Sequence, residues 1–265
     1  MSKLKILCAA SALALTAGMA SAATVEVTGI TSQWISWTGG GSTVSTSPPG
    51  ADPATLRWGT QMNDQKRQSG YDFDAVDATA AAPVTAEENV EFKLGDFTHL
   101  NWTINTATGI KSATLEVTFD LLLAGGVTDT LTSKFLFEHW ETPNDDKPCA
   151  DGGQKGQGVN KNGCADRVIV STLPLGDDGI IELENENGDT FKYTFDILGF
   201  KQNGQTVNTF WTKESADNKA SLYARFTYAE NINTGPSPVP VPAAGFLLLG
   251  GLAALGAAVR RRKAA

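Results

Sequence analysis

The sequence has two histidines, and the first, His99, lies in the stretch EFKLGDFTHLNWTI. Alternate side chains of a β-strand share a face, so we expect Leu100, Trp102 and Ile104 to face the core. His99 and Asn101 should then emerge together on the opposite side, where both can form hydrogen bonds and the imidazole can bind a metal. We interpret them as a small polar pair and not as a catalytic site.

The second histidine, His139, lies in the stretch FEHWETPNDD. A strand here would place Phe135, Phe137 and His139 on one face. Several oxygen ligands are close in sequence: Glu138, Glu141, Asn144, Asp145 and Asp146. Two interpretations stay open, a solvated acidic turn or a calcium site without the spacing of an EF-hand. The candidate ligands of the calcium site are Glu141, Asn144, Asp145 and Asp146, and we expect no other cofactor.

Signatures of enzymatic chemistry are missing from the sequence. It has no G-x-S-x-G nucleophile motif, no P-loop and no dinucleotide-binding fingerprint. Glycosidases need two carboxylates at a defined separation, and 29 acidic residues offer many pairs without selecting one. We therefore predict a protein that is not an enzyme.

Tryptophans near the N-terminus offer another kind of site. Trp34, Trp37 and Trp58 lie in polar surroundings, and exposed aromatic rings can stack on the faces of sugars. The stretch SQWISW is otherwise a strand whose tryptophans fill the core, as large aromatic side chains usually do. We favour the core, and Trp34 and Trp37 stay as candidate ligand-binding residues.

Cys149 and Cys164 flank a loop rich in Gly, Asn and Lys. In an exported protein such a pair predicts a disulfide, since the compartments outside the cytoplasm are oxidising. Closing a loop of this size stabilises the fold by roughly 3 kcal/mol in the chain-entropy model. Half of a zinc site is the alternative, but the sequence has no C-x-x-C pair.

Both ends of the chain have the pattern of targeting segments. Residues 1–22 carry lysines, an apolar run and small residues in the order of a signal peptide. Residues 233–242 alternate proline with small residues, which predicts an extended linker. Residues 243–259 are uncharged and just long enough to cross a membrane, and the basic cluster in 260–265 would stay in the cytoplasm. We expect the precursor to insert transiently in the inner membrane, with the domain 23–232 outside.

The body of the chain is strongly acidic. The two end segments contain six of the 21 basic residues, which leaves 15 against 29 acidic ones. Binding to phosphate backbones needs clustered Lys and Arg. We therefore exclude nucleic acid as a partner.

Between the ends, apolar residues recur with a period of two, and no segment keeps a helical period over three turns. The strands predicted in this way span 114–123, 133–140, 189–200 and 220–230. Asn187-Gly188 predicts a hairpin turn, Gly39 to Pro53 a loop, and 74–90 either a loop or a short helix. We predict an all-β fold, an antiparallel two-sheet β-sandwich of jelly-roll type.

The tail resembles the PEP-CTERM sorting signal of Gram-negative bacteria, in its variant with V-P-L-P-A at the front. The matching residues are Val239, Pro240, Val241, Pro242 and Ala243. The common form has Glu where Val241 stands. The resemblance implies that an exosortase-type membrane transpeptidase cuts at or near this motif and passes the protein to the cell surface or the extracellular matrix.

The body resembles the choice-of-anchor K domain, which includes PEP-CTERM proteins named for a T-H-x-N motif. Thr98, His99 and Asn101 match that motif, and a second motif is matched by Glu141, Thr142, Pro143 and Asn144. ILGF and FWTKESADNKASLYA follow in the same order, so that the matches span residues 90–230. Proteins with this domain carry different surface anchors, and the resemblance implies no enzymatic activity.

Together these patterns predict an exported structural or adhesive protein of the cell surface or the biofilm matrix. The alternative is a lectin-like module, assisted by calcium, whose partner is extracellular polysaccharide.

Overall fold

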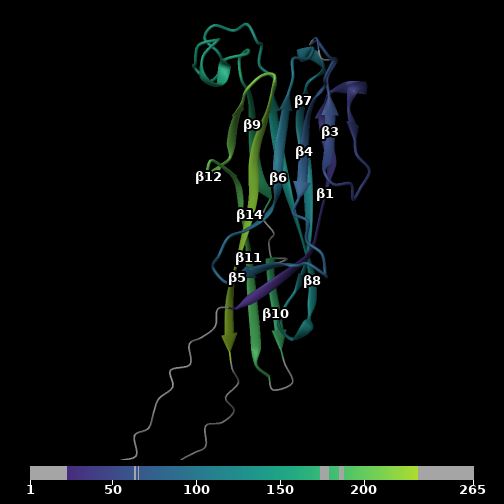
Figure 1. Cartoon of the computed structure of the whole chain (residues 1–265), viewed down its shortest axis with the longest axis vertical. Coiled ribbons are helices and arrows are strands. Elements are labelled where there is room, and N and C mark those ends of the chain that lie inside the picture. Colours follow the sequence, from purple (N-terminus) through teal and green to yellow (C-terminus); the bar gives the residue numbers. More distant parts are fainter. Residues whose placement is uncertain (1–22, 63, 65, 174–178, 185–187, 232–265) are drawn as a thin grey trace, which may run out of the picture. The chain divides into compact units, whose positions relative to one another are not determined.

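The computed structural model describes residues 23–231, apart from positions 63, 65, 174–178 and 185–187. The chain divides into a larger unit, which runs to Ile181 and includes Lys192–Ala229, and a smaller unit of Glu182–Phe191 with the chain from Glu230 onward. The described residues form β-strands, four short 3-10 helices and no α-helix (Figure 1). The prediction of an all-β fold is confirmed.

The first sheet is antiparallel, with the strand order β13–β9–β8–β7–β1–β5. Its strands are β1 (Thr24–Gly39), β5 (Val84–Glu87), β7 (Ile110–Leu122), β8 (Thr128–Trp140), β9 (Asp166–Leu173) and β13 (Thr209–Thr212). Buried and exposed residues alternate along β8, as a strand with one face on the core requires.

The second sheet has the order β10–β11–β14–β6–β4–β3–β2, and β12 pairs with β11. Its strands are β2 (Ser45–Thr46), β3 (Ala54–Trp58), β4 (Ser69–Ala75), β6 (Phe92–Asn101), β10 (Ile180–Glu184), β11 (Thr190–Gln202), β12 (Gln205–Val207) and β14 (Ala216–Asn231). The 3-10 helices are η1 (Gly41–Thr43), η2 (Thr106–Thr108), η3 (Ala124–Gly126) and η4 (Gly158–Asn160).

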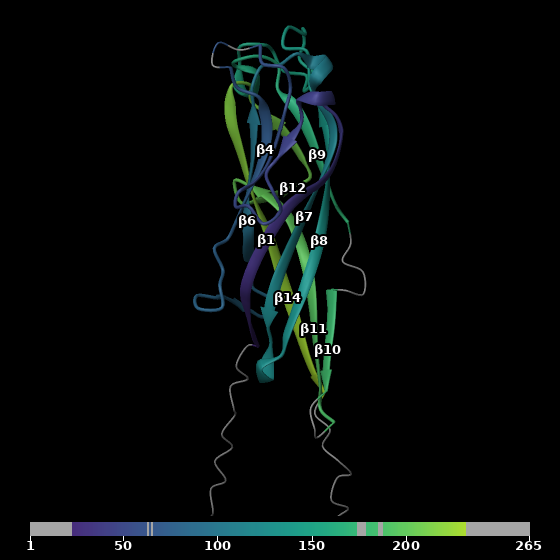
Figure 2. The ribbon, with the colours of Figure 1, turned by 90° about the vertical axis from the view of Figure 1, so that its right-hand side faces the viewer.

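Within the larger unit the two sheets pack face to face, with β4 and β6 on one side and β8 and β9 on the other (Figure 2). Aromatic rings from both sheets meet between them. The ring centroids of Phe97 and Phe137 lie 4.9 Å apart, and those of Phe135 and Phe200 lie 5.5 Å apart. This is the antiparallel sandwich that the alternation predicts.

The four strands predicted from alternation are present as β7, β8, β11 and β14. β10 and β11 are neighbours in the second sheet, as the predicted hairpin requires, although Asn187 lies outside the described residues. The segment 74–90 is neither of the two forms expected, because it contains β5. Only Ala86 of β5 is buried, so this strand has no apolar alternation by which to recognise it.

A long loop, residues 141–165, joins β8 to β9 and is the teal coil beyond their ends in Figure 1. Cys149 and Cys164 form the predicted disulfide in it, with a Cα–Cα distance of 5.3 Å. Both cysteines are buried. The cross-link therefore fixes the loop where its return limb reaches β9.

The predicted signal peptide, linker, sorting motif and membrane helix lie outside the described residues. Among the residues that are described, no helix is long and apolar enough to cross a membrane.

Candidate functional site

A cluster of buried polar side chains lies between the sheets of the larger unit, where β4, β6, β8, β9 and β13 meet the 141–165 loop. Its members are Trp58, Tyr71, His99, Asn101, His139, Glu141, Thr142, Asn144, Asp166, Thr212 and Glu214. Strand register brings them together, because Tyr71 pairs with His99 across β4 and β6, and Thr212 pairs with Asp166 across β13 and β9. We call this set the polar cluster.

The expectation that His99 and Asn101 face away from the core is wrong, since both are fully buried. β6 ends at Asn101, so Trp102 and Ile104 do not belong to the strand and cannot set its inward face. The residue that does set it is Phe97, two positions before His99, which points into the core. Reading the alternation from Phe97 would have placed both polar residues inside.

His99 and Asn101 bind the short strand β13 of the opposite sheet. Thr212 Oγ1 donates its proton to the Asp166 carbonyl at 3.1 Å. Because that proton is used, His99 Nδ1 donates to Thr212 Oγ1 at 3.0 Å. Asn101 Nδ2 donates to the Thr212 carbonyl at 3.0 Å. His99 and Asn101 of the T-H-x-N motif therefore hold the two sheets together, and His99 Nε2 has no hydrogen-bond partner among the described residues.

His139 is held at both of its ring nitrogens. Its Nδ1 lies 2.7 Å from the Tyr71 hydroxyl, and its Nε2 lies 3.2 Å from Glu141 Oε2. The His139 side chain is fully buried and that of Glu141 is 7% exposed. Phe135, Phe137 and His139 share the inward face of β8, as predicted.

Asp166 is buried at the start of β9 and is fixed through one oxygen. The Thr142 amide donates to Asp166 Oδ1 at 2.7 Å, and the Thr142 hydroxyl lies 3.1 Å from the same atom. Asp166 Oδ2 has no hydrogen-bond partner in the described part of the protein. Thr142 thus orients the carboxyl group and leaves its second oxygen for another partner.

Glu214 follows β13 and is fully buried. Thr103 Oγ1 donates to Glu214 Oε2 at 3.2 Å, and the amide groups of Asn101 and Asn144 face the same carboxyl. Gly163 permits this approach. A Cβ there would lie 2.0 Å from Asn144 Oδ1 and 3.0 Å from Glu214 Cγ, so a side chain would not fit.

Burial dominates the electrostatics of the polar cluster. Burial raises the pKa of Glu141 to about 8. Trp58 Nε1 faces this carboxyl and partly opposes the rise, although it does not reach hydrogen-bond geometry. Burial and repulsion from Glu141 raise the pKa of Glu214 to about 7, and they raise the pKa of Asp166 well above its usual range. Burial lowers the pKa values of His99 and His139. Three acids that resist ionising thus surround neutral histidines.

The four predicted calcium ligands are not brought together. Glu141 and Asn144 belong to the polar cluster, whereas Asp145 and Asp146 are exposed and Asp145 pairs with Lys155 on the surface. Asp166 and Glu214, which complete the group of carboxyls, lie 25 and 73 positions beyond Glu141. No local sequence pattern links residues so far apart.

The two candidate ligand-binding tryptophans, Trp34 and Trp37, also differ in burial. Trp34 is buried and its Nε1 donates to the Ala54 carbonyl at 3.1 Å, so it is a core residue. Trp37, three positions along β1, is 40% exposed. Only Trp37 of the two is available to a ligand.

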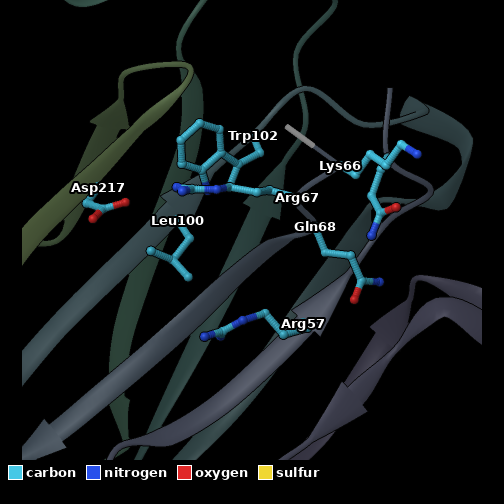
Figure 3. Close-up of a pocket in the computed structure, with 8 residues that line it drawn as sticks. Arg57, Lys66, Arg67, Gln68, Leu100, Trp102 and Asp217 are labelled. Carbon is cyan, nitrogen blue, oxygen red and sulfur yellow. The ribbon is translucent and has the colours of Figure 1, made fainter. Parts of the chain in front are cut away.

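A surface pocket lies on the outer side of β6, near the turn that leads into β4 (Figure 3). Arg57, Lys66 and Arg67 line it together with Leu100, Trp102 and Asp217. The Arg67 guanidinium lies 4.6 Å from the centre of the Trp102 ring, a cation–π distance. Three basic side chains and one acidic one thus line the pocket, and Arg57 is paired with Asp72.

The sequence matches no protein-family model and no curated protein. Function must therefore be argued from the chemistry of the residues. In the polar cluster, ligand atoms of His139, Glu141 and Asp166 all lie within 4.8 Å of one another, a spacing at which the three side chains could hold a metal ion.

Proposed function

We propose that the protein is exported and, after its tail is processed, persists at the cell surface or in the extracellular matrix of a Gram-negative bacterium as a structural or adhesive protein. The observation that carries the proposal is the buried disulfide between Cys149 and Cys164. Disulfides persist in oxidising compartments and are rare in the cytosol. The signal-peptide pattern of residues 1–22 and the sorting-signal pattern of 239–265 point to the same compartment.

The two motifs behind the choice-of-anchor K resemblance also fit a structural role. His99 and Asn101 of the first motif bind Thr212, and Thr142 of the second binds Asp166 beside it. The motif residues therefore support one another inside the domain and do not form a surface site. This arrangement suits a stable scaffold that displays its outer faces.

Intact-mass analysis of protein released from the cell surface tests the proposal. We expect a mass that lacks residues 1–22 and the chain beyond the 239–243 motif, because an exosortase-type enzyme would remove the membrane segment. A matched strain without that enzyme should retain the protein in the inner membrane. A released mass that includes residues 243–265 would refute the sorting proposal.

Glycan binding is the second candidate, and the basic pocket of Figure 3 is the observation that favours it. Positively charged side chains beside an aromatic ring suit an anionic sugar such as a uronic acid. The test is retention on the producer's own polysaccharide, with Lys66→Glu as the disrupting variant and Trp37→Ala as the variant of the exposed ring. Loss of retention only in Lys66→Glu would assign binding to the pocket, and equal elution of folded wild-type protein and variants would exclude it.

A further inference from the structure

The polar cluster contains more ligand atoms than its own hydrogen bonds use. Six buried polar atoms in it have no hydrogen-bond partner among the described residues: Trp58 Nε1, His99 Nε2, Asn101 Oδ1, Asn144 Oδ1, Asp166 Oδ2 and Glu214 Oε1. Leaving one such atom unpaired in an apolar interior costs about 1–3 kcal/mol. Five of the six are acceptors, so what they lack is a cation or a proton donor.

Three side chains within the cluster converge on one point. Ligand atoms of His139, Glu141 and Asp166 lie within 4.8 Å of one another, and His139 Nε2 is 3.2 Å from Glu141 Oε2. Zn–N and Zn–O bonds of about 2.0–2.2 Å place neighbouring tetrahedral ligands roughly 3.3–3.6 Å apart. The His139–Glu141 distance of 3.2 Å is thus just short of one edge of a zinc tetrahedron.

The surrounding groups are those that orient metal ligands. A metal-bound histidine usually donates its other ring N–H to an acceptor, and ligating carboxylates are themselves hydrogen-bonded. Tyr71 lies 2.7 Å from His139 Nδ1, and Thr142 fixes Asp166 Oδ1. These contacts leave His139 Nε2 beside Glu141 Oε2 and leave Asp166 Oδ2 without a hydrogen-bond partner among the described residues.

We propose that His139, Glu141 and Asp166 bind one Zn²⁺ or a similar first-row divalent ion, which joins β8, the 141–165 loop and β9. The imidazole nitrogen and the carboxylate oxygens are both zinc ligands, whereas calcium and magnesium take oxygen ligands alone. Two carboxylates balance the charge of the ion, as burial of an ion demands. Glu214, which lies close enough for Glu141 to raise its pKa, is not one of the three converging ligands.

The site is structural, because its ligands are buried and come from segments that must be held together. The inference does not depend on the cellular location proposed above, since it uses contacts within the domain only.

The experiment measures metal content and thermal stability of the purified full-length chain. We expect about one zinc per chain by elemental analysis. After dialysis against a chelator, Zn²⁺ should raise Tm in a saturable way, and Mn²⁺ less. Ca²⁺ and Mg²⁺ should have no effect. A chain that folds without bound metal and shows no shift with any of these ions would overturn the proposal, and a shift with Ca²⁺ or Mg²⁺ alone would overturn the assignment of the metal.

Substitutions locate the ion. His139→Gln and Asp166→Asn should abolish the Zn²⁺-dependent shift, whereas Tyr71→Phe should weaken zinc affinity about 10- to 100-fold through loss of orientation. Asp145→Asn is the matched control, because Asp145 is an exposed acid three positions after Thr142 and should leave binding unchanged. Zinc binding that survives both His139→Gln and Asp166→Asn would refute the site.

A second readout covers variants that fold poorly. Co²⁺ bound in place of Zn²⁺ absorbs visible light, and its spectrum depends on its ligands. The Co²⁺ spectrum of the Tyr71→Phe variant should differ from that of the wild-type protein, whereas the spectrum of Asp145→Asn should not. An identical Co²⁺ spectrum in Tyr71→Phe would contradict the role of Tyr71 in orienting His139.

Discussion

The interior of the larger unit contains two regions of opposite character. In the apolar region, Phe97, Phe135, Phe137 and Phe200 pack ring against ring across the sheets. In the polar cluster, buried side chains leave six polar atoms without hydrogen-bond partners in the described part of the chain. The apolar region is stable through its own contacts, because burial of such rings is favourable in itself. The polar cluster needs either bound protons or a cation, so we expect its stability to depend on pH and on metal ions.

The largest expected effect lies in the apolar region. Phe135→Ala removes a fully buried ring that contacts Phe200. Such truncations cost about 3–5 kcal/mol through lost burial and the cavity that remains. Urea unfolding should show this loss equally with chelator and with Zn²⁺. A loss that depended on the metal would mean that the two regions are not independent.

The next effect concerns the loop that covers the polar cluster. Replacing both Cys149 and Cys164 with alanine should lower the free energy of unfolding by about 3 kcal/mol, because the unfolded chain is no longer constrained. Since Thr142 binds the carbonyls of Cys164 and Ala165, this variant should also bind zinc more weakly. Calorimetry with and without Zn²⁺ checks both effects. Unchanged zinc affinity would show that the loop forms without its cross-link.

The polar cluster should also make the metal-free protein sensitive to pH. The carboxyls of Glu141 and Glu214 have unfolded pKa values near 4.5 and folded pKa values of about 8 and about 7. Between these values the folded state holds more protons than the unfolded state. Stability therefore falls as pH rises through this range. The lowered histidine pKa values partly oppose this fall near pH 6.5, because unfolded histidines still hold protons there that the folded protein does not. In chelator, unfolding free energy should drop by about 2 kcal/mol across the window from about pH 6.5 to 8.

Urea titrations at several pH values measure this slope, and Glu141→Gln should reduce it by removing one titrating group. Zn²⁺ should flatten it in the wild-type protein. A stability that rises from pH 6.5 to 8 in chelator would mean that the buried carboxyls ionise freely.

The smallest effect is expected at Trp37, the exposed one of the two tryptophans of β1. Trp37→Ala should change stability by no more than about 0.5 kcal/mol, as is usual for surface substitutions. Trp34→Ala should cost about 3–5 kcal/mol, because Trp34 packs on Tyr71 and Phe137. Thermal melts of both variants, run side by side, test the comparison. Equal losses would place Trp37 in the core.

Sequence reasoning recovered what alternation and spacing encode locally. β7, β8, β11 and β14 were predicted, and so was the disulfide. β5 was missed because its single buried residue gives no pattern. The inward face of β6 was assigned wrongly, because the strand ends before Trp102 and the alternation was read from residues beyond it.

The polar cluster could be predicted only in part. Glu141, Asn144 and the two histidines stood out as polar residues with ligand chemistry. Asp166 and Glu214 did not, because only the pairing of β13 with β9 and the return of the 141–165 loop bring them to His139. Asp145 and Asp146 carry the same carboxyl group as Asp166, yet both side chains are exposed to solvent.

The first sheet ends at β13 on one side and at β5 on the other, and each of these edge strands has only four residues. β13 is also tied inward through Thr212, which His99 and Asn101 bind from the opposite sheet. Short edges offer few free backbone groups to a neighbouring chain. At these two strands, a neighbouring copy of the domain would therefore find few backbone groups to pair with.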